Sequence, residues 1–280
     1  MNFQCGNRKL DFSVAHVMGI LNVTPDSFSD GGRFNSVDSA LRHAEQMVSD
    51  GATLIDIGGE STRPGADTVT TEEELARVIP AVEAITARLD VAVSVDTSNP
   101  EVIRQSAAAG AHLINDVRSL RLDGALQAAA ATGLPVCLMH WDGDPGAVKE
   151  APQYSQPIET VVKQFLQARV SACEGAGIGR DKILLDPGFG FGKNHQHNFR
   201  LLNRLDALHE LGLPLLTGLS RKRMIGEATG TETADQRGSG SVTGAVICAL
   251  KGAKILRVHD VKQTAEAIRV LTATLREGNE

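Results

Sequence analysis

Eight short apolar runs, rich in β-branched residues, recur along this chain of 280 residues, and each is followed by a longer segment with helical periodicity. This alternation predicts βα units that form a parallel sheet. We expect strands at 16–22, 53–57, 91–96, 112–116, 135–140, 183–186, 214–219 and 255–259. We expect helices at 37–50, 72–88, 100–109, 123–132, 157–175, 197–211, 238–251 and 262–276. Eight such units favour one (β/α)8 TIM barrel domain over residues 1–280, with a doubly wound open sheet as the competing α/β fold.

Two of the expected helices carry start signals. The segment Thr71-Glu-Glu-Glu74 has the spacing of a capping box, and Asn99 precedes a first-turn proline, Pro100. No linker or low-complexity tract divides the chain. The sequence therefore predicts a single domain.

Composition and charge exclude several classes of protein. The chain is 42% hydrophobic and has a net charge of −6, with 28 basic and 34 acidic residues and no basic tract, so we expect no nucleic-acid partner. No apolar run approaches the ~18 residues of a membrane span. The first residues lack the apolar core of a secretory signal, and the four cysteines are far apart in sequence. We therefore expect a cytoplasmic protein with reduced, mostly buried thiols.

Polar residues occur at the ends of nearly all the expected strands, where a parallel barrel should otherwise be apolar. They are Asn22, Asp56, Asp96, Asn115, Asp116, His140, Asp186, Ser220, Arg257 and His259. The carboxyl ends of barrel strands meet at one mouth, which is where barrel enzymes place their active sites. Any one of these residues is as well explained by a structural role, but the whole set predicts a site.

The first strand leads into a polar loop that ends in two glycines, at residues 18–32. Asn22, Asp26 and Asp30 offer oxygen ligands, which suit a hard cation such as Mg²⁺. An ordinary surface loop is the alternative interpretation.

An anion site is predicted at the seventh and eighth strands, because barrels often bind phosphate there. The basic stretch Ser220–Arg223 follows the seventh strand, and Arg257 and His259 lie at the end of the eighth. Lys222 can act as a point charge and Arg257 as a two-pronged donor. The alternative is a solvated helix start with paired surface charges.

A glycine-rich loop at 186–193 follows the sixth strand, but it is not a Walker loop, because Asn194 stands where Ser or Thr would hold magnesium. Its glycines would let the backbone approach a planar ligand, with Asp186 accepting hydrogen bonds from ring nitrogens. The aromatics Phe28, Phe34, Trp141, Phe189 and Phe191 are expected in loops after strands, where a flat ring would use such surfaces. Taken singly, Phe189 or Phe191 is better explained by packing in the core. His195 and His197, two apart on an expected loop, are interpreted as surface residues rather than zinc ligands.

Seven segments, in order over nearly the whole chain, resemble the signatures of the dihydropteroate synthase family, the folate-pathway enzymes that sulfonamides inhibit. They are 19–32, 56–65, 94–97, 114–116, 186–193, 220–222 and 257–259. The resemblance implies a barrel enzyme, usually a homodimer. The implied reaction condenses (7,8-dihydropterin-6-yl)methyl diphosphate with 4-aminobenzoate and releases dihydropteroate and diphosphate.

The resemblance also implies roles for individual residues. Asp96, Asn115, Asp186 and Lys222 would hold the pterin, and Asn22, Thr62, Arg63, Arg257 and His259 would hold the diphosphate, with Mg²⁺ near Asn22 and Asp30. Phe28, Pro64 and Ser220 would border the aminobenzoate, and Phe191 is a further substrate contact. Lys222, Asp96, Asp186, Asp30 and Arg63 are the expected catalytic residues. Loops 22–36 and 60–70 are expected to close over the site and exclude water.

Two residues depart from the commonest family pattern: Trp141 follows Met139-His140, and Arg223 follows Ser220-Arg-Lys222. The runner-up function is a related pterin-binding barrel that transfers a methyl group from a reduced folate. Lys222, Arg257 and the 18–32 loop argue against it, because such an enzyme has no diphosphate to bind. A non-catalytic pterin-binding module is disfavoured, because the full set of candidate catalytic residues is present.

Overall fold

The computed structural model of the chain describes residues 2–24, 33–60, 69–141, 143 and 153–277, with the backbone alone at 33–36. Its centre is an eight-stranded sheet in the order β8-β7-β6-β5-β4-β3-β10-β9, and all its strand pairs are parallel. The two edge strands meet through a parallel bridge between Leu185 and Leu215, where Leu185 N donates to Pro214 O over 3.0 Å. This contact closes the sheet and confirms the expected (β/α)8 barrel.

The strands of the barrel are short. They are β3 (His16–Asn22), β4 (Leu54–Gly58), β5 (Ala92–Asp96), β6 (Leu113–Asp116), β7 (Val136–Met139), β8 (Ile183–Asp186), β9 (Leu216–Thr217) and β10 (Ile255–Val258). All eight expected strands are present, although β9 is much shorter than the predicted 214–219.

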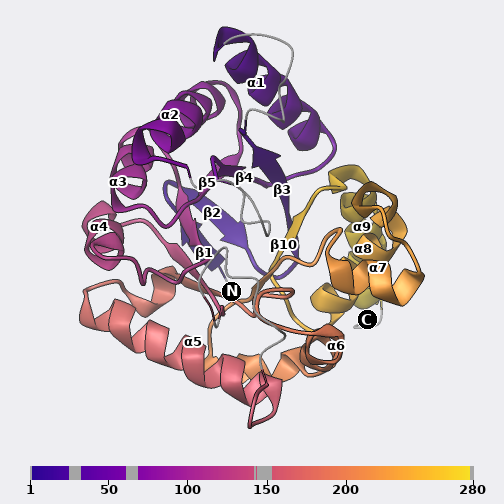
Figure 1. The fold of residues 1–280 in the computed structure, drawn as a ribbon. Coiled ribbons are helices and arrows are strands. Elements are labelled where there is room, and N and C mark those ends of the chain that lie inside the picture. Colours follow the sequence, from indigo (N-terminus) through magenta and orange to yellow (C-terminus); the bar gives the residue numbers. More distant parts are fainter. Residues whose placement is uncertain (1, 25–32, 61–68, 142, 144–152, 278–280) are drawn as a thin grey trace.

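Helices surround the barrel (Figure 1). They are α1 (Arg33–Ser49), α2 (Thr71–Arg88), α3 (Pro100–Ala108), α4 (Ala125–Thr132), α5 (Ile158–Gly175), α6 (His195–Asn203), α7 (Arg223–Thr229), α8 (Gly238–Leu250) and α9 (Val261–Glu277). Short 3₁₀ segments lie at Arg180–Lys182, Leu205–Leu211 and Ala234–Gln236. The prediction of one helix over 197–211 was wrong, since α6 ends at Asn203 and a 3₁₀ segment follows. Helix α7 was not predicted.

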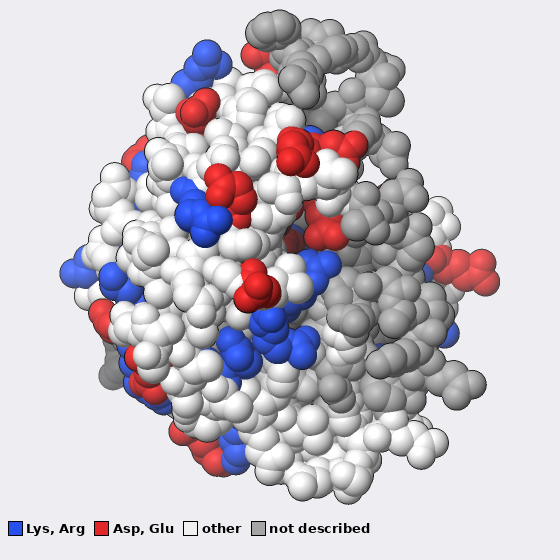
Figure 2. Space-filling model, turned by 60° about the vertical axis from the view of Figure 1, so that its left-hand side comes forward, with Lys and Arg blue, Asp and Glu red and all other residues white. Residues whose placement is uncertain are grey.

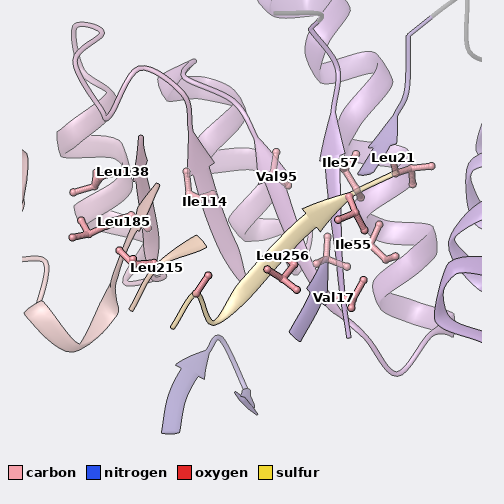
Figure 3. Packing of buried hydrophobic residues seen from close by; sticks show 14 of the residues in the cluster. Val17, Leu21, Ile55, Ile57, Val95, Ile114, Leu138, Leu185, Leu215 and Leu256 are labelled. Atoms are coloured by element: carbon pink, nitrogen blue, oxygen red, sulfur yellow. The ribbon is translucent and has the colours of Figure 1, made fainter. Parts of the chain in front are cut away.

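Side chains alternate between the two faces of each strand, so one set points outward to the helices and the other points into the barrel lumen. Outward side chains pack against the helices in the main hydrophobic core, together with residues such as Ala44 of α1 and Val82 of α2. Figure 3 shows strand residues of this core, among them Val17, Ile55 and Leu138. The inward side chains therefore belong to the barrel lumen.

The amino-terminal end of the lumen is closed by a β-hairpin that was not predicted. Strands β1 (Asn2–Cys5) and β2 (Arg8–Asp11) pair antiparallel and cross the centre of the view in Figure 1. The rings of Phe3 and Phe12 stack with centroids 5.4 Å apart. They form one cluster with an inward apolar residue from each barrel strand: Met18, Leu54, Ala92, Leu113, Cys137, Leu184, Leu216 and Ile255. The closed end leaves the carboxyl end of the barrel as the place for a site.

The observed cap of α3 agrees with the cap predicted from the sequence, whereas the cap of α2 differs from the prediction. The Asn99 side chain accepts a hydrogen bond from Glu101 N at 2.9 Å and caps α3 ahead of Pro100, as expected. The capping box of α2 is formed by Thr70 and Glu73, one residue before the predicted pair. Glu74 lies on the buried side of α2 and accepts from Thr97 Oγ1 at 2.6 Å, so it is not available to the cap.

Lys and Arg lie among Asp and Glu over the described part of the face shown in Figure 2. No helix within the described ranges is long and apolar enough to cross a lipid bilayer. The four cysteines are free and buried, as expected.

Candidate active site at the carboxyl end of the barrel

Beyond the apolar cluster at the amino-terminal end of the lumen, the inward positions of five strands become polar. Inward residues two positions further along β4, β5, β6, β8 and β10 are Asp56, Ser94, Asn115, Asp186 and Arg257. Asp96 is the next inward residue of β5, and it lies beside Asn115 in the sheet register. Strand alternation therefore brings four predicted site residues, Asp96, Asn115, Asp186 and Arg257, to the same lumen.

Arg257 is the centre of this polar group. Its Nε lies 2.6 Å from Oδ2 of Asp56, and its Nη2 lies 2.8 Å from Oδ2 of Asp96. Asn115 Nδ2 also donates to Asp56 Oδ2, over 3.1 Å. The Asp56 side chain has no exposed surface, whereas 21% of the Arg257 side chain is exposed. A buried carboxylate thus holds both the guanidinium and the amide in fixed orientations.

Asp56 was recognised in the sequence as a strand-end polar residue but was not assigned to the site. Its position in a fully buried β4, in the same inward register as Leu54, would have identified it. Asp56 Oδ1 and Ser94 Oγ are among the buried atoms in the described chain that lack a hydrogen-bond partner. Unsatisfied polar atoms at the floor of a lumen indicate a place for a ligand that carries donors and acceptors.

Burial shifts the pKa values of the ionisable groups in the lumen. The pKa of Asp96 is raised to about 7, mainly because burial disfavours its charged form, although Arg257 opposes the shift. Burial also raises the pKa of Asp186, against the opposing effect of Lys222. The pKa of Lys222 is lowered to about 8 by burial, with Asp186 acting in the other direction. Asp96 and Lys222 therefore change charge near neutral pH, which is typical of catalytic sites.

Lys222 precedes α7 and reaches back over the glycine loop. Its Nζ donates to the Phe189 carbonyl and lies 4.4 Å from the centroid of the Phe191 ring. Phe191 in turn contacts Trp141, with ring centroids 5.0 Å apart, and packs against a cluster of Val117, Met139 and Trp141. One side of the mouth is therefore aromatic and apolar, and the Asp56–Arg257 group provides polar contacts within the same lumen.

The glycine loop is shaped by close contacts of its backbone. Gly188 has φ +66°, and a Cβ there would lie 2.0 Å from the His140 carbonyl oxygen. Asp186 Oδ1 accepts from Gly188 N at 2.7 Å. Lys193 Nζ is buried and donates to the carbonyls of Gly188 at 2.7 Å and Phe191 at 2.9 Å. These contacts hold the backbone that carries Asp186, Phe189 and Phe191.

Ser220 and His259 are linked across the ends of β9 and β10. Ser220 Oγ accepts from His259 N over 3.2 Å and lies 3.1 Å from His259 Nδ1. Ser220 is buried, with 5% of its surface exposed. The two strand ends expected to form an anion site are therefore adjacent.

Two of the strand-end polar residues do not point into the lumen. Asp116 accepts from the backbone N–H groups of Arg118 at 2.7 Å and Leu120 at 2.8 Å, so it shapes the loop after β6. The His140 ring lies on the helix side, with its centroid 5.0 Å from that of Phe165 in α5. Asp116 directly follows the inward residue Asn115, and His140 directly follows the inward residue Met139. Because successive side chains of a strand point to opposite faces, both point outward.

The expected anion region holds four cations: Arg221, Lys222, Arg223 and Arg257. Two of them form ion pairs with carboxylates, which supports the alternative interpretation for those two. Arg221 pairs with Asp260 at 2.7 Å and with Asp235 at 2.6 Å. Arg223 pairs with Glu227 one helical turn later, at 2.8 Å, and its side chain is 88% exposed. Lys222 and Arg257 are the cations that reach the lumen.

Five predicted site residues, Phe28, Asp30, Thr62, Arg63 and Pro64, lie outside the described residues, as does most of the two loops expected to cover the site. Phe34 falls within α1 rather than in a loop. His195 and His197 begin α6, where His195 Nδ1 lies 2.9 Å from Glu227 Oε2. Within the described ranges, no group of three or more His, Cys, Asp or Glu side chains could hold a metal ion.

The geometry agrees with extensive similarity to known proteins. A family model described as "Pterin binding enzyme" matches residues 18–259. The dihydropteroate synthase of Escherichia coli is 60% identical over 266 residues, which cover 95% of this chain and 94% of that protein. The chain belongs to the dihydropteroate synthase family. Its members are transferases of folate biosynthesis, and the chain shares that activity.

Solved structures of dihydropteroate synthases have the same fold. That of Yersinia pestis with a sulfonamide drug complex superposes with a TM-score of 0.93 at 56% identity, covering 99% of this chain and 100% of that one. That of Xanthomonas albilineans in complex with 7,8-dihydropteroate has a TM-score of 0.89 at 46% identity, covering 98% and 99%. These matches do not favour the methyltransferase alternative.

Proposed function

We propose that the barrel lumen of this dihydropteroate synthase family member binds the pterin of (7,8-dihydropterin-6-yl)methyl diphosphate and transfers it to 4-aminobenzoate. The observation that carries this assignment is the Asp56–Arg257–Asp96 group, which lines a deep lumen beside Asn115. A pterin ring has N–H donors and ring-nitrogen acceptors along its edge. Carboxylates and an amide at fixed positions match that edge, and Phe191 offers an apolar surface for its face.

The pterin contacts follow from this arrangement. Asp96 and Asn115 lie side by side in the register of β5 and β6, so both can hydrogen-bond the same ring edge. Asp186 reaches the lumen from the end of β8. Burial raises the pKa of its carboxyl, and the charge of Lys222 opposes that increase. Carboxylates around the ring stabilise positive charge that develops on the pterin methylene when its bond to oxygen breaks.

The diphosphate would lie at the ends of β9, β10 and β3, where Arg257, His259 and Asn22 are found. Arg257 and His259 donate to its oxygens, and Lys222, which also contacts the pterin, stabilises the negative charge that develops on the leaving group. Thr62 and Arg63 are proposed to add contacts from the loop after β4. Lys222 is the catalytic cation, because its ammonium donates to the Phe189 carbonyl of the glycine loop and interacts electrostatically with Asp186.

Mg²⁺ is the proposed cofactor, and the residues at the end of β3 fit it. A Cβ built on Gly58 would lie 3.7 Å from Asn22 Oδ1 and 3.7 Å from Asp96 Cβ, so the glycine leaves space beside an amide oxygen. Mg²⁺ keeps most of its waters and binds substrate phosphates through few protein ligands, so one neutral oxygen suits it. When bound, it would neutralise charge on the departing diphosphate. Asp30 is proposed to act near this position.

The aminobenzoate is proposed to bind outside the pterin, bordered by Ser220, Phe28 and Pro64. The carbon–oxygen bond to diphosphate would break first, and the amine would then attack the cationic methylene carbon and form the carbon–nitrogen bond. The amine then loses a proton, which the released diphosphate can accept. Ser220 is held in place beside the proposed aminobenzoate position by the hydrogen bond that it accepts from His259 N.

Diphosphate release tests the proposal. We expect release to require both substrates and Mg²⁺, and to be slow with the pterin substrate alone. Asn22→Ala should raise the Mg²⁺ concentration that gives half-maximal rate. A wild-type Mg²⁺ titration for Asn22→Ala would remove Asn22 from the metal site, and methyl transfer from a folate donor would overturn the function.

We further propose that the chain acts as a single-domain cytoplasmic enzyme and as a homodimer. Leu250 of α8 and Val270 and Leu275 of α9 are exposed large apolar residues, at 56%, 68% and 52%. Helices α8 and α9 pack together and lie side by side in Figure 1. Exposed apolar side chains on two neighbouring helices suit contact with a second copy of the chain.

A further inference from the structure

Arg221 has an unusual backbone conformation between two residues of the proposed site. Its φ is +58°, a left-handed value that a residue with a Cβ rarely adopts. Its neighbours are Ser220, which bonds to His259, and Lys222, which reaches the glycine loop. Backbone strain of this kind costs about 1–3 kcal/mol and persists where surrounding contacts enforce it.

The backbone of Arg221 is held from both sides by the start of α8. Arg221 N donates to Ser241 Oγ at 2.8 Å, and Arg237 Nη1 donates to Arg221 O at 2.9 Å. Ser241 Oγ in turn donates to Arg237 O at 2.6 Å. These bonds make the left-handed turn a fixed feature of the segment.

The side chain of Arg221 points away from the lumen and joins the two loops that carry the anion-binding residues. Its Nη2 and Nε donate to the two oxygens of Asp260, at 2.7 Å and 3.2 Å, in a two-pronged pair. Asp260 directly follows His259 and is 15% exposed. A second pair, to Asp235, involves a carboxylate that is 83% exposed and therefore contributes little.

We propose that Arg221 is a positioning residue, which clamps the loop after β9 to the loop after β10 and thereby places Lys222 at the reacting groups. The turn reverses the chain at Arg221, and the Asp260 pair prevents the two loops from separating. The inference rests on the proposed role of Lys222. A displacement of ~1 Å at a reacting group can lower the rate by about 100-fold, so a clamp remote from the substrate affects catalysis.

A double-mutant cycle on kcat/KM tests this inference. Arg221→Gly keeps the left-handed turn accessible but removes the clamp, and we expect it to lower kcat/KM by about 10- to 100-fold. In a Lys222→Ala background, the same change should lower kcat/KM by less than about threefold, because the clamp acts through Lys222. A purely structural role would give the same loss in both backgrounds, which would overturn the proposal. Wild-type activity of Arg221→Gly would also overturn it.

Three further variants cover the case in which the double mutant has no measurable activity. Asp260→Asn should lower kcat/KM about as much as Arg221→Gly, whereas Asp235→Asn should change it less than about twofold. Arg223→Gln is the matched control, because Arg223 lies two residues away and is 88% exposed. Equal effects of Asp260→Asn and Asp235→Asn would overturn the clamp. Unchanged activity in Lys222→Ala alone would overturn the role of Lys222 and this inference with it, whereas loss in Lys222→Ala without loss in Arg221→Gly overturns the inference only.

Discussion

Nε of Arg257 lies 2.6 Å from Asp56 Oδ2, and this pair joins two strands that are 201 residues apart in sequence. Asp56 also accepts from Asn115, so a single buried carboxylate orients a cation and an amide of the proposed pterin site. Removing one member of a buried, hydrogen-bonded ion pair leaves the other without compensation.

We therefore expect Asp56→Ala to lower the free energy of unfolding by about 2–4 kcal/mol. Asp56→Asn should lower it less, because the amide oxygen can still accept from Arg257 or Asn115. Both variants should raise KM for the pterin substrate. Urea unfolding and steady-state kinetics measure the two effects, with Asp123→Asn, an exposed carboxylate on the loop before α4, as the control. Full stability in Asp56→Ala would contradict the structural role of the pair.

Lys222→Met should lower kcat/KM by about 10²- to 10³-fold, or about 3–4 kcal/mol of transition-state stabilisation, because it removes the ammonium next to the departing group. The methionine can still pack against the Phe191 ring, which the Lys222 ammonium faces at 4.4 Å from its centroid, so stability should change little. Lys262→Met, at an exposed position of α9, is the control. Equal kcat/KM in both variants would show that Lys222 has no part in the reaction.

The pH dependence of kcat/KM should be bell-shaped. Asp96 has a pKa raised to about 7, so below that pH it is neutral and loses its attraction for the pterin N–H groups. Lys222 has a pKa lowered to about 8, so above that pH it loses the charge that stabilises the diphosphate. Activity should therefore be highest between these two values and fall on both sides. A profile with no decrease up to pH 10 would contradict the role of the Lys222 charge.

Two glycines with similar left-handed φ values separate steric conflict from backbone strain. Gly188→Ala places a Cβ 2.0 Å from the His140 carbonyl oxygen, whereas no atom lies within 4 Å of a Cβ at Gly133. Gly133→Ala should lower the free energy of unfolding by about 1 kcal/mol, the ordinary penalty of a left-handed alanine. Gly188→Ala should lower it several-fold more and also reduce activity. Thermal unfolding compares them, and equal effects would contradict the close contact.

Charged substitutions at the exposed apolar residues of α8 and α9 test whether these helices form the dimer contact. Leu250→Glu combined with Val270→Glu should convert a homodimer to monomer in sedimentation velocity, because burying an unpaired carboxylate at an interface is unfavourable. Leu122→Glu is the control, since Leu122 is also exposed, at 44%, but lies on the segment before α4. If both charged proteins remain dimeric, the dimer uses another surface.

The alternation of apolar runs and helical segments was sufficient to predict all eight barrel strands, because each run must be buried in a parallel sheet. The hairpin at Asn2–Asp11 was missed, since its four-residue strands are stabilised by contact with the lumen residues of distant strands. Helix α7 was missed because it is only seven residues long and follows the irregular turn at Arg221.

The candidate residues of the site were visible in the sequence as polar groups at strand ends, but their directions were not. Asp56 and Asp116 were both expected at strand ends, but Asp56 faces the lumen from the middle of β4, whereas Asp116 ends β6 and shapes a loop. Arg221 and Lys222 are adjacent cations, yet one pairs with Asp260 and the other reaches the glycine loop. A shift of one residue along a strand, or one residue with a left-handed backbone, points a side chain to the opposite side. These directions depend on the register of the strands in the folded barrel.

The sequence by itself determined the barrel, its family and the composition of its mouth, because burial periodicity and short motifs are local properties of the chain. The tertiary structure decided which polar groups meet, namely Arg257 with Asp56 and Asp96, Ser220 with His259, and Arg221 with Asp260. Each of these pairs joins different loops or strands, and its formation depends on the shear and closure of the whole barrel.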